Sequence, residues 1–326
     1  MPRRAKPMLT LTALLIIPAF ATPLEAQFPP DSFENLQVLP EDITFRQLIG
    51  TMRGFASALG VRCQYCHVGE ANQPLSQFDF PSDEKATKRK ARVMLRMLNH
   101  INNEYLADLP SRREPEIQVG CETCHRGQSR PIMTRDSLRF AYQNGGVDAL
   151  ETSYRQLRTT YFGSHTHDFR WFLLRNLANE MAAAGNFADA RHVMSLNLEF
   201  FPDNPRVQSA FALVSIEAAM TLEGPEAGRA SYKNALTRFP PELLSDNGLN
   251  AMGYRLMGAS KTLEAIEIFK INTELHPNSA NAFDSLGEGY MNNGDTELAI
   301  TSYEKSLELN PENSNAVTIL ERLRSN

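Results

Sequence analysis

The residues in this chain best suited to chemistry are its cysteines, because all four lie in two copies of one short pattern. The two copies are Cys63-Gln64-Tyr65-Cys66-His67 and Cys121-Glu122-Thr123-Cys124-His125. Two cysteines separated by two residues and followed by a histidine form the attachment site of a c-type haem. Each thiol adds across a vinyl group to form a thioether, and the adjacent histidine is carried beneath the ring, where its imidazole can bind iron. We therefore predict two covalently bound c-type haems, with thioether sites at Cys63, Cys66, Cys121 and Cys124 and axial histidines at His67 and His125.

Two other interpretations of paired cysteines fit these residues less well. A short zinc ribbon separates its two cysteine pairs by roughly 15 to 20 residues, whereas 54 residues lie between Cys66 and Cys121. Zinc also gives no reason for a histidine after each pair. A redox-active pair of the thioredoxin type belongs in a βαβ surrounding, and the sequence has no such pattern. Haem attachment is therefore the interpretation that explains all the residues of both motifs.

The first motif is preceded by a segment with the pattern of an amphipathic helix. Apolar residues recur at intervals of three and four across residues 42–59, and Gly60 is a typical C-terminal cap. Met52 lies in the middle of the apolar stripe, 11 residues before Cys63. A methionine thioether is one of the sixth ligands that haem iron takes in cytochromes, where it raises the reduction potential. We predict Met52 as the sixth ligand of the first haem, with simple packing of the core or the porphyrin as the alternative.

A second amphipathic helix is predicted from about Ser82 to about Leu109, ahead of the second motif. Its apolar stripe contains Met97, which we predict as the sixth ligand of the second haem. Met94, one turn earlier, and His100, one turn later, remain alternatives. Five basic residues occupy the run 85–92; such a run forms a solvated helix face, pairs with haem propionates or docks an acidic partner.

The region around the two motifs resembles a known family. Residues from about 39 to 131, with the segments "GVRCQYCHVG", "KARVMLRMLNHINNEYL" and "VGCETCHRGQSRP", are similar to part of the cytochrome c subunit of photosynthetic reaction centres. In that family each haem unit is a helix, a turn and a CxxCH motif, and most of the helices supply a methionine ligand. The resemblance implies Met52 and His67 as ligands of one haem and His125 with Met97 as ligands of the other. Members of that family typically carry four haems in two pairs, so this chain resembles one pair, and a photosynthetic role does not follow.

The second half of the chain contains a repeat with a period of 34 residues. Gly253 and Gly287 are one period apart, and so are Pro277 and Pro311. This is the tetratricopeptide (TPR) period. Residues after about 168 are predicted to form about four helix pairs and a closing helix over 312–324. Stacked pairs of this kind leave a concave surface suited to a peptide or protein partner.

The first 26 residues have the features of a secretory signal peptide. Arg3, Arg4 and Lys6 precede a 13-residue apolar stretch that is too short to span a bilayer, and small residues follow up to Ala26. The rest of the chain has 30 basic and 37 acidic residues. With this acidic balance and no large basic surface, nucleic acid is excluded as a partner. We expect a periplasmic or otherwise exported protein with no retained membrane span, although it can still belong to a membrane complex.

These observations predict an all-α protein that joins a dihaem c-type cytochrome module to a TPR-like α-solenoid. The expected divisions are a signal peptide over 1–26, a dihaem domain over 27–135, a helical connector over 136–167 and a TPR domain over 168–326. The expected function is electron transfer by an iron-containing, haem-binding cytochrome c, and not enzymatic catalysis, with redox donor and acceptor proteins docked by the TPR groove. The alternatives are a peroxidase-type dihaem enzyme and a TPR scaffold in which haem is mainly structural.

Overall fold

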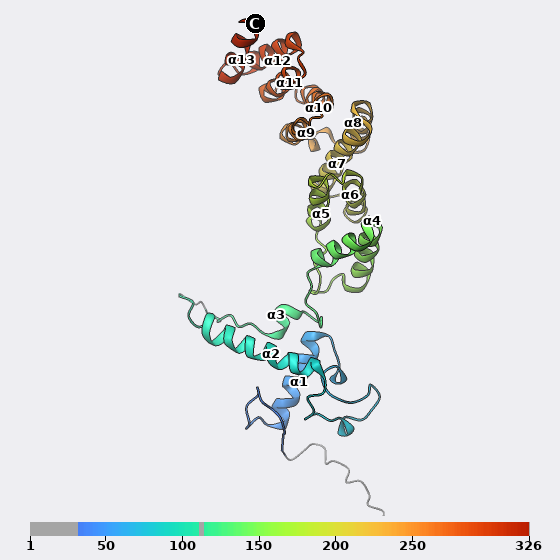
Figure 1. The fold of residues 1–326 in the computed structure, drawn as a ribbon, viewed down its shortest axis with the longest axis vertical. Helices are drawn as coiled ribbons and strands as arrows, with labels where there is room; N and C mark the ends of the chain where they lie inside the picture. The colour runs from blue at the N-terminus through green and yellow to red at the C-terminus, as the bar shows by residue number, and fades with distance from the viewer. Residues whose placement is uncertain (1–31, 111–113, 326) are drawn as a thin grey trace, which may run out of the picture. The chain divides into compact units, whose positions relative to one another are not determined.

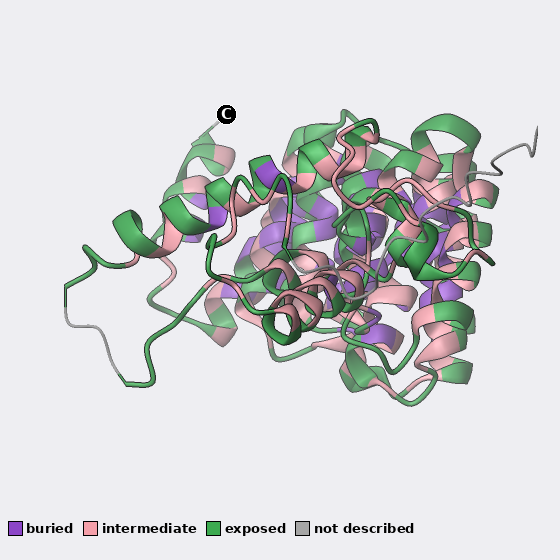
Figure 2. Cartoon of the chain, turned by 90° about the horizontal axis from the view of Figure 1, so that it is seen from below, coloured by how far each residue is buried: buried purple, intermediate pink, exposed green. Residues whose placement is uncertain are grey.

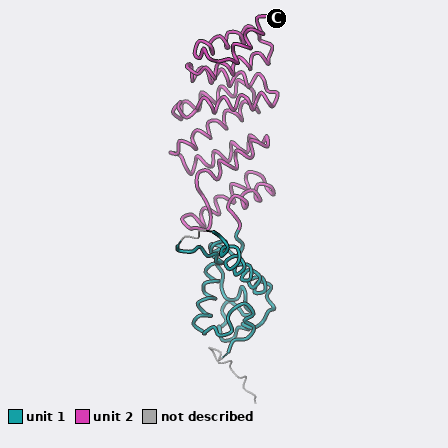
Figure 3. Tube along the Cα trace, turned by 90° about the vertical axis from the view of Figure 1, so that its left-hand side faces the viewer, with its two compact units in different colours: residues 1–131 teal, residues 132–326 magenta. Residues whose placement is uncertain are grey.

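The computed structural model describes residues 32–110 and 114–325, so the predicted signal peptide lies outside the described residues. The described part of the chain consists of helices joined by turns and loops, and contains no β-strand beyond one isolated bridge between Val68 and Asp79. This confirms the predicted all-α class. No helix in the described ranges is both long and apolar enough to cross a membrane. The chain divides into two compact units, residues 1–131 and residues 132–326 (Figure 3).

The first unit is built from short helical elements around the two motifs (Figure 1). In chain order they are α1 (Phe45–Leu59), η1 (Cys63–Tyr65), η2 (Leu75–Gln77), α2 (Ala86–His100), the π-helical η3 (Ile101–Tyr105) and α3 (Cys121–His125). Helix α1 begins at a capping box in which Thr44 and Gln47 bond each other's backbone N–H groups, and it ends at Gly60 in the left-handed conformation. The helix predicted from about Ser82 to about Leu109 is divided in two: the regular α-helix α2 ends at His100, and the π-helical turn η3 follows it.

The second unit contains the remaining helices. They are α4 (Thr134–Tyr161), α5 (Phe172–Ala183), α6 (Phe187–Phe200), α7 (Pro205–Glu223), α8 (Pro225–Arg238), η4 (Pro241–Leu243), α9 (Asp246–Gly258), α10 (Thr262–Leu275), α11 (Ala280–Asn293), α12 (Thr296–Leu309) and α13 (Ser314–Ser325). Helices α5 to α12 pack as four consecutive hairpins, each of which also contacts the next, and α13 covers the last one. Helix α4 is kinked at Gly145 and Gly146, where the backbone leaves helical geometry.

Three of the four hairpins are closed by the same buried hydrogen bond. The second helix of each carries a fully buried polar side chain that bonds the carbonyl group at the start of the first helix, 26 residues earlier. The pairs are Asn197 with Trp171, Asn272 with Asp246, and Ser306 with Ala280. A buried donor that lacked a partner would cost about 1–3 kcal/mol, so this repeated bond fixes how the two helices of a hairpin pair.

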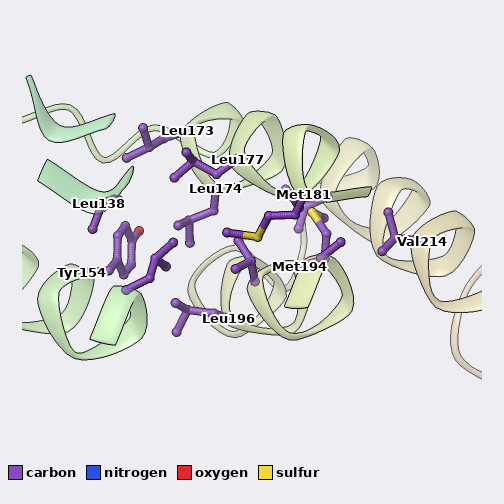
Figure 4. Close-up of a cluster of buried hydrophobic side chains, with 14 of the residues drawn as sticks. Leu138, Tyr154, Leu173, Leu174, Leu177, Met181, Met194, Leu196 and Val214 are labelled. Atoms are coloured by element: carbon purple, nitrogen blue, oxygen red, sulfur yellow. The ribbon is translucent and has the colours of Figure 1, made fainter. Parts of the chain in front are cut away.

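The apolar core of the described chain lies almost entirely in the second unit. Three clusters of buried side chains run through it, and helices α4 to α7 supply the first, in which Leu138, Tyr154, Leu177 and Met194 meet (Figure 4). In contrast, Ala58 and Leu98 are the buried apolar residues among the described residues of the first unit. Exposed and half-buried positions accordingly dominate much of the chain in Figure 2, while buried residues concentrate on the repeat helices. The first unit thus has little apolar core of its own.

Candidate functional site

The first motif forms a single tight turn directly after α1. The backbone N–H groups of Cys66 and His67 both donate to the carbonyl oxygen of Cys63, at 3.2 and 2.9 Å. The thiol residues remain free, with Cys63 exposed and Cys66 half-buried. One short turn therefore presents two unpaired sulfur atoms and one imidazole, which is the donor set that covalent haem attachment needs.

The imidazole of His67 is oriented by a backbone carbonyl group from a later loop. Its Nδ1 lies 3.3 Å from the carbonyl oxygen of Phe80, and the Phe80 ring packs edge-on against it with centroids 5.0 Å apart. Burial and, after it, the positive charge of Lys88 lower the pKa of His67. A histidine that donates Nδ1–H to a carbonyl oxygen keeps Nε2 as its free, neutral nitrogen for a metal. His67 is thus held in the tautomer that can bind iron through Nε2.

The start of α2 is tied to this first turn. Lys85 Nζ donates to the carbonyl oxygen of Gln64, and Thr87 Oγ1 donates to that of Tyr65. Both carbonyls lie between the two cysteines of the motif. The basic run predicted as a solvated face or docking surface is therefore partly turned inward, where it holds the first motif in place.

The second motif forms the short helix α3. The carbonyl oxygen of Gln128 lies 2.7 Å from Nδ1 of His125, so the second imidazole is also oriented through Nδ1 by a nearby backbone carbonyl. Cys121 is half-buried and Cys124 is exposed, and both are free. The loop before this helix is fixed by Asn102 of η3, whose amide group both donates to and accepts from the backbone of Val119 at 2.8 Å.

Burial acts on one cysteine of each motif. Burial raises the pKa of Cys66, although Lys85 opposes the shift, and burial also raises the pKa of Cys121. Redox-active and zinc-binding cysteines are thiolates with a lowered pKa. Burial thus favours the neutral thiol at Cys66 and Cys121, whereas a thiolate is what disulfide exchange requires.

The two motifs meet at the end of α1. The backbone N–H of Gly127, two residues after His125, donates to the carbonyl oxygen of Ala58 at 2.8 Å. Gly60 lies directly against the backbone of Gly127, where a side chain would clash. Because α1 ends where the chain enters the first motif, this contact brings both candidate haem turns to the same helix terminus.

The predicted sixth ligands have different surroundings. Met52 is half-buried on α1. On α2, Met94 and Met97 are 41% and 43% exposed, so their burial does not distinguish them. His100 is exposed, and its Nδ1 lies 2.5 Å from the carboxylate of Glu104. Its imidazole thus already has a partner on its own helical segment.

The exposed face of α2 fits an apolar group that is held at the motifs. Val93, Met94 and Met97 recur at helical spacing and leave 41–50% of their surface accessible. Large apolar side chains rarely gather on one exposed helix face unless that face binds something. Free thiols, oriented imidazoles and this uncovered apolar stripe together fit a porphyrin that is apolar on its faces and covalently anchored at its edge.

The sequence predicted the cysteines and histidines of these turns but not the groups that support them. Four of these supporting features were not predicted from the sequence: the carbonyl groups of Phe80 and Gln128, the bonds of Asn102 to Val119, and the contact between Gly60 and Gly127. Only Gly60 carried a signal, since it was predicted as a helix cap. The others are backbone groups or a polar side chain whose partners lie up to 17 residues away.

Comparison with known proteins places this arrangement in a family. The family model described as the photosynthetic reaction centre cytochrome C subunit matches residues 10–179, and the tetratricopeptide repeat model matches residues 280–313. Cytochrome c-554 of Chloroflexus aurantiacus is 35% identical over 99 residues, which are 28% of this chain and 22% of that protein. The photosynthetic reaction center cytochrome c subunit of Rubrivivax gelatinosus is 31% identical over 91 residues, 26% of this chain and 23% of that protein.

The chain thus spans about a quarter of the length of these curated relatives. Among solved structures, one of MamA protein is 14% identical with a TM-score of 0.31, and the match covers 56% of this chain and 92% of that one. The family model covers more than half of the 326 residues, including both CxxCH turns, their supporting loops and α4. The chain belongs to the photosynthetic reaction centre cytochrome c subunit family and carries tetratricopeptide repeats at its C-terminal end.

Proposed function

We propose that this protein is an exported dihaem c-type cytochrome that transfers electrons, with its TPR unit docking it to a partner protein or complex. The observation that carries the proposal is that both CxxCH turns pair free thiols with a histidine whose Nδ1 lies within hydrogen-bonding distance of a backbone carbonyl oxygen. When bound, each haem supplies an iron that takes up or releases one electron. The chain's residues do the rest: the thiols anchor, the carbonyls orient the imidazoles, and the apolar face of α2 excludes water.

The number of haems is tested by the absorbance of the denatured haem adduct and by the mass of the intact protein. We expect two haems per chain, one in a variant with Cys63→Ala and Cys66→Ala, and one in a variant with Cys121→Ala and Cys124→Ala. A chain with no covalent haem, or with two haems in either variant, would contradict the proposed attachment sites.

The proposed sixth ligands are Met52 for the first haem and Met97 for the second. Ferric haem with a methionine ligand has a weak sulfur-to-iron absorption band at the red end of the visible spectrum. We expect Met52→Ala and Met97→Ala each to remove part of this band. Met94→Ala is the matched control, because Met94 lies one turn from Met97 and is equally exposed; a loss of the band in Met94→Ala alone would transfer the role to Met94.

Electron transfer is distinguished from peroxidase-type catalysis by exogenous ligands. Peroxidase chemistry needs a haem with an open or displaceable sixth position. If both sixth positions are filled by the chain, carbon monoxide should bind slowly and incompletely to the reduced protein. Rapid, complete binding at one haem would favour the enzyme instead. If neither haem cycles reversibly with protein electron carriers, the scaffold alternative holds.

Export and docking complete the proposal. Export is supported by the basic and apolar pattern of residues 1–26, and c-type haem is attached to the protein after translocation. The mature N-terminus, read by mass spectrometry, is expected at Gln27. Docking is supported by the stacked hairpins α5 to α12. We expect removal of the whole second unit, residues 132–326, to abolish co-sedimentation with membranes of the native organism and to leave the haem spectrum unchanged.

A further inference from the structure

The carbonyl oxygen of Phe80, which orients His67, has a second and charged partner. Lys88 Nζ donates to it at 2.7 Å, while His67 Nδ1 lies 3.3 Å away. The same ammonium group also donates to the carbonyls of Pro81 and Ser82, both at 2.9 Å. The side chain of Lys88 is only 12% exposed. Its charge is therefore fixed one carbonyl oxygen away from the first imidazole, and solvent screens it weakly.

The charge of Lys88 is not cancelled by its acidic neighbour. Asp83 lies 3.2 Å from Lys88 Nζ but is also 2.6 Å from Arg92 Nη1, so one carboxylate faces two cations. Arg92 and, after it, Asn35 hold the pKa of Asp83 well below its usual range, which keeps the carboxylate ionised. Lys85 adds a further positive charge at the same turn. The surroundings of His67 thus carry a net positive charge.

A fixed positive charge here has a definite effect on a metal bound by His67. A carbonyl oxygen that already accepts from an ammonium group is a poorer acceptor for the imidazole N–H, so the ring donates less electron density to iron. The positive charge also opposes the ferric state directly, because ferric iron carries one more positive charge than ferrous iron. Both effects favour the ferrous form and raise the reduction potential.

We propose that Lys88 is a positioning residue that raises the reduction potential of the first haem site, acting through the Phe80 carbonyl that it shares with His67. The inference rests on the proposed function, because it requires a haem on Cys63 and Cys66. It is specific to the first site, since Lys88 bonds the carbonyl of Phe80, whereas His125 lies against that of Gln128 at 2.7 Å.

The test is a spectroscopic redox titration of the full-length, haem-loaded protein with soluble mediators. Each site gains one electron on reduction, as ferric iron becomes ferrous, and no bond is made or broken. Lys88→Met is expected to lower one midpoint potential so that the ferrous-to-ferric ratio at fixed ambient potential falls about tenfold, which is about 59 mV for a one-electron couple. The other midpoint should stay in place.

Three further variants make the expected sign specific. Lys88→Arg keeps the charge and should restore most of the wild-type potential. Asp83→Asn removes a negative charge beside Lys88 and should raise the same midpoint. Lys90→Met is the matched control: it removes one charge from an exposed side chain of the same helix and should move neither midpoint.

The outcomes separate this inference from the proposed function. If the wild-type chain carries no covalent haem, the proposed function fails, and the inference fails with it. If two haems are present in every variant, but Lys88→Met matches Lys90→Met or Asp83→Asn lowers the potential, the role of Lys88 alone is overturned. If Lys88→Met does not load haem, the midpoint potentials of Lys88→Arg and Asp83→Asn test the role of Lys88. A midpoint unchanged in Lys88→Arg and raised in Asp83→Asn would support it, and a midpoint lowered in Asp83→Asn would overturn it.

Discussion

The two motif histidines, which we propose as axial ligands, are oriented by atoms outside the CxxCH motifs. His67 is oriented by Phe80, 13 residues later, and His125 by Gln128, three residues later. The pattern of cysteine and histidine could be recognised from sequence because covalent chemistry fixes both the residue types and their spacing. A supporting backbone carbonyl could not, because any residue has one and only the folded loop decides which one reaches the imidazole.

The proposed methionine ligands could be chosen from sequence only as far as helical spacing allows. Periodicity placed Met94 and Met97 on one face of α2, and both are in fact similarly exposed. The choice between them depends on where a porphyrin would lie, which the proposed thioether bonds would set and the helix does not. The prediction of Met52 is sharper, because α1 offers one methionine in the segment before the first motif.

A carboxylate of the second unit provides a residue-scale prediction about pH. Glu151 accepts hydrogen bonds from His192 Nε2 at 2.5 Å and from Arg155 Nε at 2.8 Å. Both bonds lower the pKa of Glu151, and the bond from His192 has the larger effect. A lowered folded-state pKa stabilises the fold above the unfolded-state pKa of about 4.3 and loses that effect as the pH falls. We expect Glu151→Gln to lower the melting temperature at pH 7 by about 2–4 °C, and we expect this difference to shrink from pH 7 to pH 3 as Glu151 becomes protonated.

The change is best followed through the fluorescence of Trp171, the single tryptophan of the chain, which lies in the second unit. Glu242→Gln is the control, since Glu242 is exposed on η4. Glu242→Gln should melt like the wild type at both pH values. A difference between Glu151→Gln and the wild type that stays constant from pH 7 to pH 3 would rule out ionisation of Glu151 as the cause.

At the scale of elements, helix boundaries were predictable where a local signal marks them. Residues 42–59 were predicted as a helix ending at Gly60, and α1 runs Phe45–Leu59 with that cap. The predicted helix from about Ser82 to about Leu109 begins later, at Ala86, and becomes π-helical at Ile101. No local signal marks this change; it places Asn102 where its amide reaches Val119, which is a tertiary contact.

The junction between α1 and the second motif gives an element-scale prediction. Gly60 has φ of 64° and lies against the Gly127 backbone, so Gly60→Ala adds both left-handed strain of about 1–2 kcal/mol and a clash. We expect guanidinium to unfold Gly60→Ala at a lower midpoint concentration than the wild type, with haem absorbance as the measure of unfolding. Gly50→Ala in the same helix is the control: its added methyl group meets nothing, so it should stabilise by up to about 1 kcal/mol. Equal effects of the two variants would contradict the close approach.

The repeat helices give a second prediction of the same kind. A Cβ atom at Gly253 of α9 would run into the ring of Phe269, which is fully buried on α10 and has no room to move. We expect Gly253→Ala to destabilise the second unit by about 1–3 kcal/mol, measured by circular dichroism during thermal unfolding. Gly258→Ala, on the same helix with open space around it, should not destabilise. Gly287 of α11, one 34-residue period later, lies against the ring of Tyr303 on α12 in the same way.

At the scale of the whole molecule, the two units differ in what stabilises them. The second unit has three buried clusters of its own, whereas Ala58 and Leu98 are the buried apolar residues in the described part of the first. A unit with so little buried apolar surface cannot offset the loss of chain entropy on folding. The proposed covalent haem would cover the exposed apolar residues of α2, and we expect it to complete the core of the first unit.

This difference predicts how the whole molecule responds when its thioether sites are removed. A full-length variant with all four cysteines changed to alanine should lose the helices α1 to α3 of the first unit and keep the helices α4 to α13 of the second, because the core clusters of the second unit contain no residue of the motifs. Limited proteolysis with mass spectrometry is the measurement: early cleavage should fall before residue 132 in the variant and be suppressed there in the haem-loaded wild type. Cleavage spread evenly over both units would mean that the repeats depend on the haem unit for their own stability, and equal resistance of variant and wild type would mean that the first unit folds without haem.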